Sequence, residues 1–207
     1  AVIITAGFAE LGSEGKELQE RIVETARRAG IVFIGPNCNG FMNPWDKLYI
    51  DFPNYHVPAG GIALVCQSGG IMDGLVRQIM IKGMGCSLCV ASGNEADLRM
   101  EDYLTYLAED PHTKVILCYI EGFKDGERFL HIAREVTRKK PVVVVKAGRT
   151  KAGAKAAASH TASIAGDDAI FDAVCKQAGV CRVKNLQQML NIGAAFACQP
   201  LPKGRRV

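Results

Sequence analysis

The chain has 207 residues, of which 48% are hydrophobic, and its formal net charge is +4. This length and composition are typical of a globular protein with one good core and part of a second. No apolar run approaches the roughly 20 residues of a membrane helix, no secretory signal is visible, and the only basic cluster is Lys203–Arg206. We therefore expect neither a membrane nor a nucleic-acid partner.

The eight cysteines carry little chemistry of their own. Without a secretory signal they are typical of reduced intracellular thiols, and we expect a cytoplasmic protein. Cys86 and Cys89 form a Cys-x-x-Cys, but their segment is typical of a buried strand and no second pair follows. We therefore expect this chain to bind no metal ion.

The first unit, residues 1–57, begins with a predicted β-α-β segment whose helix is capped by Ser13 and stopped by Gly30. One such segment leaves its sheet uncovered, so we interpret it as the C-terminal remnant of a Rossmann-like domain whose front half is absent. Residues 35–58 contain four prolines and are predicted to connect two domains. The predicted elements are Val2–Thr5, Ser13–Ala29 and Ile31–Ile34.

The second unit, residues 58–207, alternates short β-rich runs with amphipathic helices. This alternation predicts a flavodoxin-like parallel sheet covered on both faces. The predicted strands are Ile62–Cys66, Cys86–Ala91, Val115–Ile120, Val142–Lys146 and Val180–Val183. The predicted helices are Ile71–Met80, Glu101–Glu109, Glu127–Lys139 and Asp168–Gln177.

Polar turns follow the predicted strands, and in an open parallel sheet such turns meet at the ligand crevice. The first turn, Gln67-Ser68-Gly69-Gly70, leads directly into a helix, whose free N–H groups and dipole predict an anion site. The alternative is that Ser68 only caps that helix. The other turns are Ser92-Gly93-Asn94-Glu95, Glu121-Gly122 and Lys146-Ala147-Gly148-Arg149.

His160 lies in a stretch of small residues, 155–166, which leaves room for a phosphoryl group and for loop motion. Glu121 directly follows a predicted buried apolar strand, and an unpaired carboxylate at a buried strand end is costly. We therefore expect His160 to be its partner. A carboxylate on one ring nitrogen raises the basicity of the other and stabilises the charged ring. The other interpretation of His160 is an incidental histidine in a surface loop.

Seven motifs in order along nearly the whole chain resemble those of the α subunit, or α portion, of ADP-forming acyl-CoA synthetases and, more distantly, of succinyl-CoA synthetase. They are Ala6-Gly-Phe8, Ile34-Gly-Pro-Asn-Cys-Asn-Gly-Phe-Met-Asn-Pro44, Ala63-Leu-Val-Cys-Gln-Ser-Gly69, Ser92-Gly-Asn-Glu-Ala-Asp97, Tyr119-Ile-Glu-Gly122, Lys146-Ala-Gly-Arg149 and Ser159-His-Thr-Ala-Ser-Ile-Ala-Gly166. The chain departs from the family at Gly70-Ile71, where Ala-Leu is common, and at Ala162, where glycine is common.

The resemblance implies an acid–thiol ligase that converts acyl-CoA, phosphate and ADP reversibly into a carboxylic acid, CoA and ATP. It implies that His160 is transiently phosphorylated and that Glu121 holds its ring. It further implies phosphate binding at Gln67, Ser68, Gly69 and Gly70, and CoA in the vicinity of Asn37, Cys38, Gly93 and Asn94.

The resemblance also implies what surrounds this chain. Residues 1–57 correspond to the end of a CoA-binding Rossmann-like domain and residues 58–207 to the flavodoxin-like ligase domain. ATP or ADP with Mg²⁺ would bind to an ATP-grasp portion, present as a β subunit or a fused domain, in an oligomer. One alternative is a non-catalytic acyl-CoA or CoA sensor, although the chain retains both His160 and Glu121. Another is an FMN-binding flavodoxin, for which the hydroxyl-rich phosphate loop and flanking aromatic residues are not evident.

Overall fold

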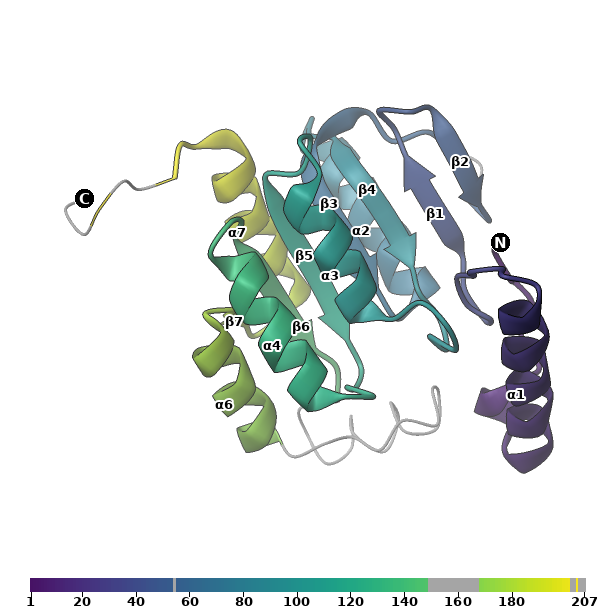
Figure 1. Cartoon of the computed structure of the whole chain (residues 1–207). Coiled ribbons are helices and arrows are strands. Elements are labelled where there is room, and N and C mark those ends of the chain that lie inside the picture. Colours follow the sequence, from purple (N-terminus) through teal and green to yellow (C-terminus); the bar gives the residue numbers. More distant parts are fainter. Residues whose placement is uncertain (54, 149–167, 202–203, 205–207) are drawn as a thin grey trace.

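A seven-stranded sheet with helices on both faces organises the computed structural model, which describes residues 1–53, 55–148, 168–201 and 204 (Figure 1). The strand order is β2-β1-β4-β3-β5-β6-β7. Strands β3 to β7 are parallel, and their order is the 2-1-3-4-5 order of flavodoxin-like sheets. These five strands are β3 (Ala59–Cys66), β4 (Cys86–Ala91), β5 (Val115–Ile120), β6 (Val142–Lys146) and β7 (Cys181–Val183).

The helices form two layers. Helices α2 (Gly69–Ile81) and α7 (Leu186–Cys198) cover one face, and α3 (Met100–Glu109), α4 (Gly126–Thr137) and α6 (Asp168–Ala178) cover the other (Figure 1). Adjacent residues of β3 point to opposite faces, so Leu64 packs with the α2 and α7 side and Val65 with the α3 and α4 side. Every residue of β4 and β6 is buried, as two covered faces require.

The prediction for the second unit is confirmed strand by strand, with boundaries that move by three residues at most. Cys86 and Cys89 lie buried in β4, as expected for that run. Helix α7 had no counterpart among the predicted helices. Its N-cap is Asn185, whose side-chain Oδ1 accepts a hydrogen bond from the Gln188 backbone N–H at 2.9 Å. It packs closely on β5, because a Cβ on Gly193 would lie 2.8 Å from Leu117 Cδ1.

Residues 35–58 are more ordered than the predicted connector. They contain β1 (Gly40–Asn43) and β2 (Leu48–Asp51), an antiparallel pair that extends the sheet beside β4. Asn43 and Asp46 shape the turn between them through two hydrogen bonds, of 2.7 and 3.2 Å. Each strand has four residues, too few for an alternating pattern to stand out, and the four prolines dominated the sequence signal.

Residues 1–39 form a separate helical arm that holds η1 (Ala9–Leu11) and α1 (Ser13–Arg28). The predicted helix is confirmed, but its N-cap is Gly12 and Ser13 makes no capping bond. The two predicted strands are reduced to one parallel bridge between Val2 and Ile34. Isolated bridging is what two extended segments form when the described residues supply no third strand to pair with them.

Among the described residues, no helix combines the length and the hydrophobicity that crossing a bilayer requires.

Candidate functional site

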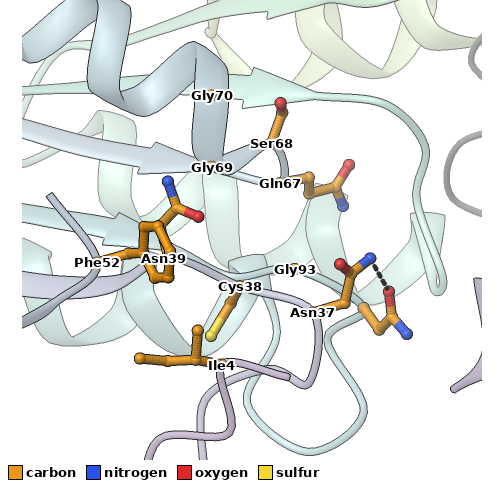
Figure 2. Close-up of a pocket in the computed structure, with 11 residues that line it drawn as sticks. Ile4, Asn37, Cys38, Asn39, Phe52, Gln67, Ser68, Gly69, Gly70 and Gly93 are labelled. Atoms are coloured by element: carbon orange, nitrogen blue, oxygen red, sulfur yellow. Dashed lines mark hydrogen bonds between the residues drawn. The ribbon is translucent and has the colours of Figure 1, made fainter. Parts of the chain in front are cut away.

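The turns after β3 and β4 face residues 37–39 and Phe52 around a pocket of about 390 Å³ (Figure 2). All eight residues predicted to bind phosphate or to lie near CoA are on its wall, and their roles stay predictions. The lining residues are Ile4, Asn37, Cys38, Asn39, Phe52, Gln67, Ser68, Gly69, Gly70, Gly93 and Asn94.

One wall of the pocket is the start of α2. Ser68 is the N-cap, and its Oγ accepts a long hydrogen bond of 3.5 Å from the Ile71 N–H. The N–H groups of the first helical turn have no partner within the helix, and the helix dipole places positive charge there. Ser68 therefore caps its helix, and the same turn offers donors to an anion in the pocket.

Glycine is needed at the first helical position. A Cβ on Gly69 would lie 2.4 Å from Cγ of Asn39, which Figure 2 shows against the start of α2. A Cβ on Gly70 would meet no atom within 4 Å. Gly70, where alanine is common in the family, thus leaves open space beside the first turn of α2.

The opposite wall joins residues 36–37 to the turn after β4. Asn37 donates a hydrogen bond to Asn94 Oδ1 at 3.2 Å (Figure 2), and the Asn94 N–H donates to the Pro36 carbonyl at 2.9 Å. Gly93 has φ +60°, and a Cβ there would lie 2.3 Å from the Pro36 oxygen. The close backbone approach explains why glycine stands at this position.

Asn94 also holds the helical arm. Its side-chain amide donates to Glu10 Oε2 and, at 3.0 Å, to Gln19 Oε1. Glu10 itself accepts hydrogen bonds from the Gly7 and Phe8 backbone N–H groups, at 2.6 and 3.1 Å. Asn94 therefore connects the Ala6-Gly7-Phe8 motif with the rim of the pocket.

Glu121 lies at the end of β5 with 5% of its surface exposed, and it does not line the pocket. Its backbone N–H donates to Gln67 Oε1 at 2.6 Å, so one side chain links it to the pocket wall. His160 and Arg149 lie outside the described residues, and the pairing of His160 with Glu121 stays a prediction.

Gln67 differs from its predicted role in one respect. Its side-chain Nε2 donates to Glu95 Oε2 and to the Gly122 carbonyl, both at 3.0 Å. An amide nitrogen has two hydrogens, so both donors are used within the protein. Its side chain therefore holds neighbouring turns together, and its backbone N–H donates to the Tyr119 carbonyl at 3.1 Å. In this arrangement Gln67 offers a phosphate no free donor, and the donors of this turn come from the start of α2.

Glu95 is a site residue that the sequence analysis placed in a polar turn without assigning it a role. It is 3% exposed, and its two carboxylate oxygens accept hydrogen bonds from Ser92 Oγ at 2.8 Å and from Gln67 Nε2. Burial raises the pKa of Glu95 to about 7, against the effect of these hydrogen bonds and of Lys124. The available signal was an acidic residue in the short turn that follows the buried strand β4.

The fourth strand end also carries a buried charge. Lys146 closes β6 with 4% of its surface exposed, and its Nζ lies 5.7 Å from the centre of the Phe171 ring. Burial lowers the pKa of Lys146. No group of three or more potential metal ligands occurs among the residues that the structure describes.

Comparison with known proteins identifies relatives over the whole chain. Residues 59–196 match the family described as succinyl-CoA ligase like flavodoxin domain. The chain is 45% identical over 206 residues to the alpha subunit of ADP-forming acetate–CoA ligase II of Pyrococcus furiosus, covering 100% of this chain and 45% of that protein. It is 42% identical over 200 residues to the ADP-forming acetate–CoA ligase of Methanocaldococcus jannaschii, covering 97% of this chain and 28% of that protein.

The fold has counterparts among solved structures. One is dinucleotide-forming acetyl-coenzyme A synthetase 1 of Ca. Korarchaeum cryptofilum in complex with phosphate and ADP, with a TM-score of 0.93 and 38% identity over 99% of this chain and 44% of that one. ATP citrate lyase of Methanothrix soehngenii has a TM-score of 0.72 at 18% identity over 99% of this chain and 36% of that one, a likeness of fold alone. The chain thus spans less than half the length of the relatives that it matches.

Proposed function

Because the chain belongs to the family of the succinyl-CoA ligase-like flavodoxin domain, together with the α portions of ADP-forming acyl-CoA ligases, we propose that it is the α portion of such a synthetase. The observation that carries the proposal is one pocket, lined by the start of α2 and by the turn after β4, to which Gln67 ties the Glu121 end of β5. The ligase names of the relatives favour an enzyme over a regulatory CoA sensor.

The proposed reaction has three steps, written in the direction of ATP formation. A phosphate oxygen attacks the thioester carbonyl of acyl-CoA, the carbon–sulfur bond breaks, and CoA leaves as the thiol with an acyl phosphate remaining. A ring nitrogen of His160 then attacks the phosphorus, and the carboxylic acid leaves with the bridging oxygen. Finally an oxygen of ADP attacks the same phosphorus, the nitrogen–phosphorus bond breaks, and ATP forms with His160 restored.

Each proposed role follows from a property of the site. The start of α2 at Ser68, Gly69 and Gly70 would stabilise the phosphate through free N–H groups and the helix dipole, the dipole alone contributing about 0.3–2 kcal/mol depending on burial. Glu121 would hold the His160 ring and stabilise its charged form. Asn37, Cys38, Gly93 and Asn94 would form the side of the pocket nearest to CoA.

The surroundings of the chain are part of the proposal. Residues 1–57 would be the end of a CoA-binding Rossmann-like domain, and residues 58–207 the ligase domain, although the β1–β2 pair already belongs to the ligase sheet. An ATP-grasp portion, separate or fused, would bind ADP or ATP with Mg²⁺. We propose that the whole synthetase is an oligomer in the cytoplasm.

The test is phosphorylation of the complete synthetase, with its ATP-grasp portion, by γ-labelled ATP and Mg²⁺. We expect one acid-labile phosphoryl group per α portion and its loss in His160→Asn. His131→Asn, on the exposed side of α4, is the matched control and should keep the label. Label that survives in His160→Asn would place the reactive residue elsewhere.

A further inference from the structure

The side chain of Gln67 connects the ends of three neighbouring strands. It follows β3, accepts hydrogen bonds at Oε1 from the N–H groups of Glu121 (2.6 Å) and Gly122 (3.2 Å) after β5, and donates from Nε2 to Glu95 Oε2 after β4. Its second Nε2 hydrogen goes to the Gly122 carbonyl. Four hydrogen bonds use the whole donor and acceptor capacity of the amide.

Among the described contacts, Glu95 is the one side-chain partner that helps to set which way this amide is turned. An ionised carboxylate can only accept hydrogen bonds, so the NH₂ end of Gln67 must face Glu95 and the oxygen must face Glu121. The reversed amide would set its single oxygen against two acceptor oxygens, those of Glu95 and Gly122, and its NH₂ against two N–H donors, so all four bonds would be lost. The charge on Glu95 therefore strengthens the orientation that the backbone groups of Glu121 and Gly122 also favour, in which Gln67 Oε1 meets the Glu121 N–H.

Glu95 changes its charge near neutral pH. Burial raises its pKa to about 7, while Ser92 and Gln67 donate to it and Lys124 attracts its negative charge. The other ionisable groups facing it are Glu101 and Tyr103 on α3 and Cys118 on β5. Protonation would weaken the hydrogen bond from Gln67, because hydrogen bonds to ionised groups are roughly twice as strong as neutral ones.

We propose that Gln67 and Glu95 form a clamp that positions Glu121 for phosphoryl transfer, with ionised Glu95 holding the Gln67 amide in its working orientation. The clamp rests on the proposed function, because it acts through the residue assigned to hold His160. Gln67 and Glu95 are positioning residues. Displacement of a positioned group by about 1 Å can slow a reaction about 100-fold, so a lost backbone contact at Glu121 has a measurable effect.

The experiment exchanges the two side chains in the complete synthetase. Gln67→Glu sets a second carboxylate against Glu95, and we expect phosphohistidine formation at pH 8 to slow by about 10- to 100-fold. Gln67→Glu combined with Glu95→Gln restores one acceptor and one donor, because the new amide at position 95 can donate to the new carboxylate at position 67. We expect this double variant to recover most of the lost rate. Gln187→Glu, on α7 and bonded only to Asn191 among the described contacts, is the control.

A pH profile separates positioning from a merely structural role. In the wild type we expect the transfer rate to fall from pH 8 to pH 6 as Glu95 takes up a proton, and we expect a smaller fall in Glu95→Gln. An unchanged rate in Gln67→Glu, or a double variant no faster than that single variant, would overturn the clamp. If Gln67→Glu does not fold, the pH profile of Glu95→Gln decides: a profile identical to that of the wild type would overturn the clamp and leave the proposed function standing. A wild-type synthetase that gains no label would overturn the proposed function and the clamp together.

Discussion

Burying the carboxyl group of Glu95 costs stability, yet neighbouring side chains hold this group in place by hydrogen bonds. Its carboxyl is buried close to Cys118 of β5 and to α3, and it accepts two side-chain hydrogen bonds, from Ser92 and Gln67. A buried ionisable group that is held by several hydrogen bonds is typical of functional sites, where perturbed pKa values are common. Sequence reasoning could place Glu95 after a strand, but its burial depends on α3 and on the turn after β5.

The pKa of Glu95 leads to a prediction about stability. Burial raises it from 4.5 to about 7, so the folded state holds this proton more tightly than the unfolded state does. The resulting stabilisation is present below pH 4.5 and is lost as the pH rises through about 7, by about 3 kcal/mol at most. Glu95→Gln removes this titration. We expect urea unfolding to show that the free energy of unfolding of the variant, minus that of the wild type, is larger at pH 8 than at pH 5. A constant difference would mean that Glu95 does not titrate in this range.

At the scale of elements, the glycines of α2 lower its helix stability, and one of them allows a neighbouring side chain to approach the helix backbone closely. Gly69, Gly70 and Gly74 all lie in this helix, where glycine is less favourable than alanine by about 0.8–1 kcal/mol. Gly69 has a packing reason, since the Asn39 side chain occupies the space of a Cβ. Gly74 has open space around it and no such reason.

Two substitutions in α2 should therefore have opposite effects. Gly69→Ala forces the Asn39 side chain to move, and we expect a loss of about 1–3 kcal/mol of stability together with weaker phosphate binding. Gly74→Ala, one turn further along, should raise the stability by about 0.5–1 kcal/mol and leave phosphate binding unchanged. Thermal unfolding and phosphate titration of both variants are the measurements. Equal effects of the two substitutions would remove the steric role assigned to Gly69.

At the scale of the whole molecule, the helical arm of residues 1–39 joins the core through its last residues, where Ile34 and Cys38 are buried, while helix α1 lies apart from the strands. Helix α1 buries only Gly15 and Ala26. Much of the attachment is polar: Asn94 bonds Glu10, Gln19 and Asn37, and the Phe33 N–H donates to Asp97 Oδ2 at 2.9 Å. Because Asn37 and Cys38, on the proposed CoA side of the pocket, belong to this arm, its attachment bears on the site as well as on the fold.

Asn94→Ala removes the three side-chain hydrogen bonds that cross this junction. We expect amide hydrogen exchange to speed up by about tenfold or more in residues 1–39, while the strands from β3 to β7 keep their protection, because local opening depends on local contacts. Asn191→Ala, on the far end of the chain in α7, is the control. The measurement is amide hydrogen exchange, followed by mass spectrometry on the wild type and both variants. Equal protection of α1 in all three proteins would show that other contacts hold the arm.

The sequence by itself determined the elements whose signal is local. The runs that became β3 to β7 are continuous and apolar because both faces are covered, and the turns after them are polar because parallel strands end together at one edge. For this reason the sequence alone predicts that Ser68, Gly69, Gly93 and Asn94 lie at one edge of the sheet. The resemblance of seven motifs supplied the family, which neither composition nor periodicity could give.

Only the tertiary structure decided the features that depend on distant residues. Strands β1 and β2 exist because β4 offers an open edge for pairing, while their four-residue sequences look like a proline-rich connector. Gln67 reaches Glu95, 28 residues away, and the Glu121 backbone, 54 residues away, and nothing near it in the chain indicates these bonds. The burial of a side chain and the direction of an amide are set by what the fold brings beside them, and the amino-acid order nearby does not record it.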